Sequence, residues 1–332
     1  MQFQSQAKPP VGIVFDADLG NTIDDALALA SLYGFQGKGE SRVISVSTTK
    51  SSLNAAVFAD VLVRFYTGEP GPFLGPAPIG LTIGKGSPDT PLMNAVLGKV
   101  TSEGKPAFGR AVHQMNDTAD PLAVLRNALS AQYDGNAIVF LSGPATNLAK
   151  AMELPDVKPL IEAKVRYLVV ALGNFADGAA DPQVLADVAS AKKLFAEWPT
   201  QIVAAGSEIG ELLRFPGASL EKEFAWSPMH PVVEAYRAAK AMPYDAPGTT
   251  LAAALYAVRP KQGYFKLSDA GMISVSDDGK TKLTPGSGKR QFLIADETQK
   301  ERITQVWVET ASTKPVPRGP RFRPPVQEKK QE

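Results

Sequence analysis

Residues 11–30 read VGIVFDADLGNTIDDALALA, and this stretch decides the fold of the chain. Its first five residues are apolar, which is typical of a buried strand in a parallel sheet, and the alanines and leucines after Asp25 predict a packed helix. The carboxylates of Asp16, Asp18, Asp24 and Asp25 lie in and just after this junction. Open α/β sheets place ligand sites at the carboxyl ends of their strands. The stretch therefore predicts an acidic site at the end of the first strand.

The crowding of four carboxylates favours a bound cation. Like charges that are buried together resist ionisation unless a cation neutralises them. Carboxylate oxygens are hard ligands and the stretch has no Cys or His, so Ca²⁺ or Mg²⁺ suits it better than Zn²⁺, and an irregular loop favours Ca²⁺. Helix capping is the alternative, because Thr22 and Asp25 fit a capping box and acids complement the start of a helix dipole. Capping accounts for Asp24 and Asp25 and leaves Asp16 and Asp18 for a site.

The composition limits the class of protein. A net charge of +1 over 332 residues gives no electrostatic reason to expect nucleic acid or an anionic membrane as a partner, so a small ligand fits better. The chain has no Cys, which excludes disulfides, thiolate metal sites and a Cys nucleophile. No apolar run has the length of a transmembrane helix, and the first ten residues lack the apolar core of a signal peptide. We expect a soluble protein, either cytoplasmic or exported with its signal peptide removed.

The strand-then-helix pattern repeats along the chain. Strands are predicted over 42–48, 137–142, 164–172 and 201–204, and helices over 54–66, 120–132, 185–196, 207–213, 221–258 and 296–309. Alternation of this kind implies a mostly parallel sheet with right-handed crossovers. Residues 263–295 carry short alternating stretches with Gly and Asp turns, which predict a small antiparallel excursion. We predict one large α/β domain over 11–312 with a Rossmann-type open sheet, a flexible N-terminus over 1–10 and a disordered Pro/Arg/Lys tail over 313–332.

Several motifs together resemble the inosine-uridine-type nucleoside hydrolases. The segment DADLGNTIDDALA (residues 16–28) is similar to the family signature, a strand ending in Asp-x-Asp-x-Gly followed by Asp-Asp-Ala-Leu-Ala, with two extra residues. SGPATNLA (residues 142–149) is similar to the family's Gly-Pro-Leu-Thr-Asn-Leu-Ala segment. The turn at Gly173 and Asn174 resembles the family's Gly-Asn turn, and Asp245 lies where the family has a distal metal-binding Asp. The resemblance extends from residue 11 to about residue 260.

The resemblance implies a reaction and a ligand set. The reaction is hydrolysis of the N-glycosidic bond of a ribonucleoside to ribose and free base, through an oxocarbenium-like state. The implied Ca²⁺ is held by Asp18, Asp25, the carbonyl of Thr146 and Asp245, with the ribose 2′ and 3′ hydroxyls completing the shell. Asp24 is implied to be the general base on a metal-bound water, and Asp16 to support the cluster. The resemblance also implies a homo-oligomer, either a dimer or a tetramer.

The chain departs from the family pattern at its leaving-group acid. Many members have a His before the distal Asp, and that position here is Tyr244. The only histidines are His113 and His230, and a lone His is more often structural than catalytic. The acid is therefore unassigned by the sequence.

The expected substrate contacts also depart from the pattern. The family's Glu-x-Asn pair corresponds to Asp181 and Gln183, which could still bind a sugar hydroxyl or lie in solvent. The family's Asn after the second strand is replaced near Lys50, which could pair with a carboxylate, bind a charged substrate group or lie at the surface. Asn174 is either a turn residue or part of the site, and its place after a buried strand favours the site. Tyr244 completes the set of expected contacts.

Two alternatives stay open at this stage. A haloacid-dehalogenase-type phosphatase would use Asp16 and Asp18, which follow an apolar strand as in that family's Asp-x-Asp motif, but it has no use for Asp24 and Asp25. A non-catalytic, Ca²⁺-dependent binder of a nucleoside or sugar would keep the acids without the leaving-group acid. Measurement of ribose release against ligand binding separates the second alternative from the hydrolase.

Overall fold

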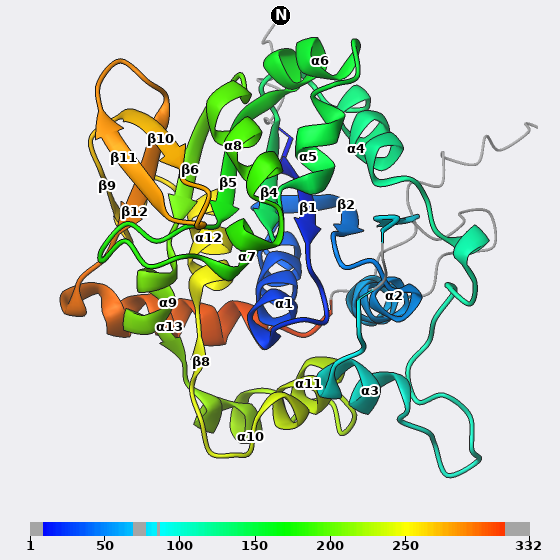
Figure 1. Ribbon diagram of the computed structural model, residues 1–332. Coiled ribbons are helices and arrows are strands. Elements are labelled where there is room, and N and C mark those ends of the chain that lie inside the picture. Colours follow the sequence, from blue (N-terminus) through cyan, green and yellow to red (C-terminus); the bar gives the residue numbers. More distant parts are fainter. Residues whose placement is uncertain (1–8, 69–77, 85–86, 316–332) are drawn as a thin grey trace, which may run out of the picture.

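A mostly parallel sheet runs through the middle of the molecule, with helices on both faces (Figure 1). The computed structural model describes residues 9–68, 78–84 and 87–315. Most of the predicted N-terminal and C-terminal segments, over 1–10 and 313–332, lie outside these residues. Among the described residues no helix is long and apolar enough to cross a membrane.

The main sheet has the strand order β11-β10-β12-β6-β5-β4-β1-β2-β3, with β9 paired to β12. Its strands are β1 Val11–Ala17, β2 Ser41–Thr48, β3 Ile79–Leu81, β4 Ala137–Ser142, β5 Val165–Ala171, β6 Gln201–Ala205, β9 Lys266–Leu267, β10 Gly271–Val275, β11 Thr281–Pro285 and β12 Arg290–Ile294. A separate two-stranded sheet joins β7 Arg214–Phe215 to β8 Ala246–Pro247. The strands from β6 to β3 run parallel, as the alternating pattern predicted.

Helices connect the strands and cover the sheet. They are α1 Ile23–Gly37, α2 Leu53–Thr67, α3 Pro91–Leu97, α4 Pro121–Ser130, α5 Thr146–Ala151, α6 Val157–Lys164, α7 Pro182–Ala186, α8 Val188–Glu197, α9 Ser207–Leu212, α10 Leu220–Glu223, α11 Pro231–Ala239, α12 Thr249–Val258 and α13 Glu297–Ala311. The predicted helix over 185–196 is two helices, because Asp187 accepts the backbone N–H of Ser190 at 3.0 Å and starts α8 anew. The predicted helical segment 221–258 is likewise divided, with β8 between α11 and α12.

Two apolar cores lie on opposite faces of the sheet. On β1, Ile13 and Phe15 contribute to the core beneath α1, α2 and α12, and Val14 contributes to the core beneath α4, α5, α6 and α8. Side chains on successive residues of a strand point to opposite faces, which is why the near-continuous apolar run of β1 fills both cores. Burial on both faces fixes β1 in the centre of the sheet, and the acids at its carboxyl end are fixed with it.

The predicted antiparallel excursion is confirmed as the hairpin of β10 and β11. The chain then returns along β12, which pairs parallel to β6 and joins the hairpin to the rest of the sheet. Arg290 at the start of β12 is buried and donates to three backbone carbonyls between α8 and β6: Phe195 at 2.7 Å, Trp198 at 2.7 Å and Thr200 at 3.0 Å. A single guanidinium therefore joins β12 to the end of α8.

Replacement of Arg290 tests this joint. Arg290→Met leaves three carbonyls without their donor, so we expect the free energy of unfolding to fall by about 3 kcal/mol in denaturant titration. The neighbouring Lys289 is exposed, and Lys289→Met should stay within about 0.5 kcal/mol of the parent protein. Equal effects of the two substitutions would contradict the role given to Arg290.

Candidate functional site

The acid cluster lies at the carboxyl edge of the sheet, around the junction of β1 and α1. Strand β1 is paired with β2 on one side and with β4 on the other, and Ala17 is level with both Thr48 and Ser142. The residues that follow these strands therefore meet at one place. Asp16, Asp18, Asp24 and Asp25 are all buried there, none more than 7% exposed.

Asp16 is held by a chain of side-chain hydrogen bonds. Its Oδ1 accepts from Asn147 Nδ2 at 2.9 Å, and Asn147 Oδ1 accepts from the Thr82 hydroxyl at 2.7 Å. The other oxygen, Oδ2, is buried without a partner. Burial raises the pKa of Asp16 from 3.8 to about 7, although the bond from Asn147 lowers it.

Asp18 is oriented by two amides on one oxygen. Asn21 Nδ2 and Gln183 Nε2 each donate to Oδ2 at 2.8 Å. The second oxygen, Oδ1, is buried and has no hydrogen-bond partner. Burial raises the pKa of Asp18, and hydrogen bonds with Gln183, Asp25 and Asn21 oppose that shift. The structure thus brings Gln183 to the cluster and leaves one oxygen of Asp18 open.

Asp25 is surrounded by hydroxyl groups. Ser142 donates to Oδ1 at 2.5 Å, Thr250 donates to the same oxygen at 3.2 Å, and Thr22 donates to Oδ2 at 3.1 Å. The pKa of Asp25 is raised well above 3.8, first by burial and then by the charge of Asp18. Two buried carboxylates in this relation need a shared proton or a cation.

Asp24 caps a helix from the far end of the chain. Its Oδ2 accepts the backbone N–H of Thr250 at 2.6 Å and its Oδ1 accepts that of Leu251 at 3.2 Å, which satisfies the start of α12. Burial raises the pKa of Asp24 to about 7, and the N–H of Thr250 lowers it. Both oxygens of Asp24 are engaged, in contrast to the free oxygen of Asp18.

The structure does not bring Asp245 to the acids. Asp245 is exposed and accepts the backbone N–H of Gly217 at 2.9 Å. The segment after Asp245 pairs in β8 with β7, and the described contacts with Asp24 and Asp25 come from the N-terminus of α12. Asp245, expected as a metal ligand, thus has its described contact with Gly217, and none with the acids.

Tyr244, which was expected to contact the substrate, packs against Tyr236. Its hydroxyl donates to the carbonyl of Tyr236 at 2.7 Å, and the two rings stack at 4.5 Å. Burial raises the pKa of Tyr244 to about 12. Tyr244 thus belongs to the turn that carries Asp245, and none of its described contacts is with the acid cluster.

The remaining expected residues lie around the cluster. Asp181 caps α7, accepting the N–H groups of Gln183 at 2.8 Å and Val184 at 3.0 Å. The hydroxyl of Thr146, at the start of α5, donates to Asp187 at 2.6 Å. Asn174 is buried after β5, and its Nδ2 donates to Ser207 at 2.9 Å.

Neither histidine contacts the acids. His113 is exposed, and its backbone N–H donates to Asp117 at 2.9 Å. His230 is 2% exposed within a group of aromatic rings, and its Nδ1 accepts the N–H of Val232 at 3.3 Å at the start of α11. Burial lowers the pKa of His230 to about 3, so it stays neutral as a helix cap.

Ser142 and Thr250 are the site residues that the sequence motifs did not single out for their side chains. Ser142 closes the apolar run of β4, which is the position at which a parallel strand presents a side chain to a site. Thr250 had no comparable local signal, because its contact with Asp25 joins residues 225 positions apart.

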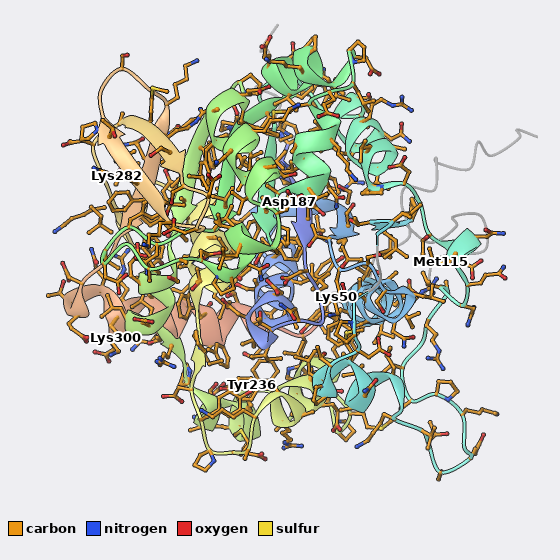
Figure 2. The ribbon with its side chains drawn as sticks, in the orientation of Figure 1. Lys50, Met115, Asp187, Tyr236, Lys282 and Lys300 are labelled. Atoms are coloured by element: carbon orange, nitrogen blue, oxygen red, sulfur yellow. The ribbon has the colours of Figure 1, made fainter. Side chains whose placement is uncertain are left out.

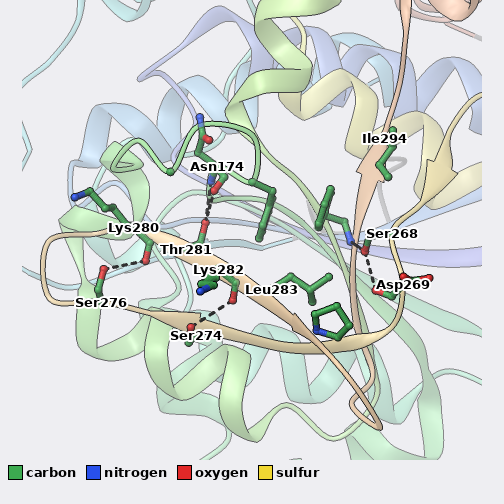
Figure 3. A pocket seen from close by; sticks show the side chains of 14 residues that line it. Asn174, Ser268, Asp269, Ser274, Ser276, Lys280, Thr281, Lys282, Leu283 and Ile294 are labelled. Atoms are coloured by element: carbon green, nitrogen blue, oxygen red, sulfur yellow. Dashed lines mark hydrogen bonds between the residues drawn. The ribbon is translucent and has the colours of Figure 1, made fainter.

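A cavity of about 780 Å³ lies beside the site, between the β10–β11 hairpin and the loop after β5 (Figure 3). Asn174, Phe175, Thr281 and Phe292 are among its lining residues, and the Phe175 and Phe292 rings stack at 4.7 Å. The Thr281 hydroxyl accepts the Asn174 N–H at 2.9 Å and donates to the Asn174 carbonyl at 2.9 Å. Asn174 thus lines this cavity and also donates to Ser207, while the four acids lie outside the lining.

The donor set at the acids is suited to a hard cation. In the described part of the chain no group of three or more His, Cys, Asp and Glu could hold a metal by itself. Asp18 and Asp25 form a two-carboxylate arrangement, and Asp18 Oδ1 is an orphaned buried oxygen. A cation there needs further oxygen ligands from the backbone or from a bound molecule.

The raised carboxyl pKa values predict the pH dependence of the metal-free protein. Between roughly pH 5 and 7, Asp16 and Asp24 are protonated in the folded chain and ionised in the unfolded chain. The unfolded state then binds fewer protons, so the free energy of unfolding falls as pH rises, by about 1.4 kcal/mol per pH unit for each group. Thermal unfolding in chelator should show this fall, and Asp16→Asn should make it shallower. A rise in stability over the same interval would contradict the assignment.

Comparisons with known proteins agree with this fold. Among solved structures, the chain is similar to a plant nucleoside hydrolase, the PpNRh1 enzyme, with 19% identity over 92% of this chain and 99% of that chain and a TM-score of 0.64. It is also similar to an inosine-uridine preferring nucleoside hydrolase from Bacillus anthracis, with 15% identity over 91% of this chain and 99% of that chain and a TM-score of 0.64. A third similar structure is the type III effector protein XopQ complexed with adenosine diphosphate ribose, with 13% identity over 93% of this chain and 96% of that chain and a TM-score of 0.68. At these low identities, the similarity shows a shared fold.

The family itself is shown by the sequence. A comparison with curated proteins gives no match. The sequence model of the inosine-uridine preferring nucleoside hydrolase family matches residues 13–315. This span includes every strand after the start of β1 and all of the acid cluster. The chain therefore belongs to the inosine-uridine preferring nucleoside hydrolase family.

Proposed function

We propose that the protein hydrolyses the N-glycosidic bond of a ribonucleoside or a related riboside. The observation that carries this proposal is the open, buried oxygen of Asp18 beside Asp25, in a chain of the nucleoside hydrolase family. Family membership argues against the haloacid-dehalogenase alternative. It also accounts for Asp24 and Asp25, for which that alternative had no use.

Ca²⁺ is the proposed cofactor. Asp25 and the backbone carbonyl of Thr146 would hold it beside Asp18, and the 2′ and 3′ hydroxyls of the ribose would add the oxygen ligands that the chain does not supply. When bound, the ion would supply positive charge that keeps both carboxylates ionised and makes a neighbouring water more acidic. Asp245 is not part of this set, because it is exposed and bonded to Gly217.

Asp18, rather than Asp24, is the proposed general base. Asn21 and Gln183 hold one oxygen of Asp18, which aims the free Oδ1 at a fixed position. That oxygen would take a proton from water as the water oxygen bonds to C1′. The C1′–N bond breaks in the same step, and its electron pair leaves with the nucleobase. Asp24 has N–H donors on both oxygens, so its proposed role is to anchor α12.

Other predicted residues would bind the sugar. Asp16 Oδ2 is a buried acceptor without a partner, and a ribose hydroxyl would supply the missing hydrogen bond. Gln183 contacts Asp18, Asp181 caps the helix that carries Gln183, and Asn174 follows the neighbouring strand β5; these three residues are the further proposed sugar contacts. These positions suit a neutral polyol, whose hydroxyls both donate and accept.

A non-catalytic binder is the second candidate. The neighbour XopQ was solved in complex with adenosine diphosphate ribose, so a chain of this fold can bind a riboside derivative. In the present chain, neither histidine contacts the acids, which is the observation that favours this candidate. Binding of a riboside without release of ribose would support it.

A ribose-release assay with Ca²⁺ tests the hydrolase. On a panel of nucleosides, we expect Asp18→Asn to lower kcat by at least about 1,000-fold, because an amide cannot take the proton and coordinates a cation poorly. Asp24→Asn should lower the melting temperature and reduce kcat less than Asp18→Asn does. Removal of Ca²⁺ with chelator should abolish release, and its addition should restore it.

The exposed Asp156→Asn is the matched control and should leave both activity and stability unchanged. A larger loss of kcat in Asp24→Asn than in Asp18→Asn would return the role of base to Asp24. Full activity of Asp18→Asn would contradict the proposed mechanism.

A further inference from the structure

Lys50 is a buried cation that the acid cluster does not use. It follows β2 at the same edge of the sheet, and in the view of Figure 2 its label lies between α1 and α2. Lys50 is 7% exposed. Within the described residues, its ammonium takes part in no hydrogen bond and no ion pair, whereas its backbone N–H donates to the Thr48 hydroxyl at 3.1 Å and its carbonyl accepts the N–H of Ser52 at 2.9 Å.

The ammonium of Lys50 has no partner although most of the residue is buried, and an anionic group beside it would stabilise its charge. Suitable acceptors are close in the chain topology. The N–H of Thr49 bonds to the carbonyl of Ala17 at 2.9 Å, so Lys50 and Asp18 follow directly on paired backbone. Asp16 Oδ2 and Asp18 Oδ1 are also buried without partners, yet neither takes the Lys50 ammonium.

The open groups at this edge are therefore of two kinds. The carboxylate oxygens require a cation or hydroxyl donors, and the ammonium requires an anion. A molecule that satisfies both kinds has a polyol at one end and a negative charge at the other.

We propose that Lys50 binds a phosphate or carboxylate group of the substrate, so that the preferred ribosides are anionic. The proposal rests on the proposed riboside hydrolysis and adds the substrate class. A Lys ammonium is a compact charge with three donors, suited to a single anionic group. A charge-assisted hydrogen bond of this kind contributes about 1.5–3 kcal/mol, which corresponds to about a 10- to 100-fold preference over a neutral riboside.

Three pyrimidine ribosides separate the sources of negative charge: uridine, which is neutral, uridine 5′-monophosphate, which carries a phosphate on the sugar, and orotidine, which carries a carboxylate on the base. With Ca²⁺ present, we expect one anionic riboside to have a kcat/KM at least about tenfold above that of uridine. Lys50→Met should remove this preference. The control Lys158→Met, at an exposed lysine on α6, should retain it.

Two further readouts distinguish binding of an anion from a structural role. Lys50→Met removes the ammonium and keeps an apolar stem of similar length, so the ligand-free variant should melt close to the temperature of the parent protein. If no riboside is cleaved, the proposed function fails, but calorimetric binding of the same three compounds still tests Lys50. Equal kcat/KM and equal affinity for all three compounds, or a preference that survives Lys50→Met, would overturn the proposal.

Discussion

The cap that Asp24 places on helix α12 is the interaction on which the site depends. It joins residues 226 positions apart and brings the start of α12 against the end of β1. The same approach places the Thr250 hydroxyl between Ser142 and Asp25, at 2.9 and 3.2 Å. The start of α12 helps to bury the acids at this edge of the sheet. Their burial is the main cause of their raised pKa values.

Enclosure of four carboxylates is unfavourable for their ionised forms, and the structure compensates it unevenly. Asp24 receives two backbone N–H groups and Asp25 receives three hydroxyl groups. Asp16 and Asp18 each keep one buried oxygen without a donor. This asymmetry separates acids that hold the fold together from acids that are open to a ligand. It is the physical basis for assigning different roles to chemically identical side chains.

The predicted fold is confirmed, and it could be predicted because the sequence patterns that indicate it are local. The apolar runs of β1, β4 and β5 have the length and composition of strands buried on both faces, and the helices between them force a parallel sheet. Boundaries were less well predicted where a single capping side chain decides them, as Asp187 does between α7 and α8. The family was also identifiable from the sequence, since its motifs are short and contiguous.

The acids of the site were predictable for the same reason, because Asp16, Asp18, Asp24 and Asp25 share one short stretch. Gln183 was expected near the site and does contact Asp18. Asp245 was expected to complete a metal site, but the β7–β8 pairing fixes it elsewhere. A pairing between strands of two residues leaves almost no pattern in the sequence, so its effect on Asp245 could not be predicted.

The sequence by itself determined the parallel sheet, the acidic edge and the family, because each depends on the order of neighbouring residues. Only the tertiary structure decided which oxygen of Asp16 and of Asp18 lacks a donor, that Thr250 faces Asp25 and that the Lys50 ammonium has no partner among the described residues. These properties depend on contacts between residues far apart in the chain. Which donor pairs with which carboxylate oxygen is decided by these distant contacts, and that pairing determines the chemistry of the site.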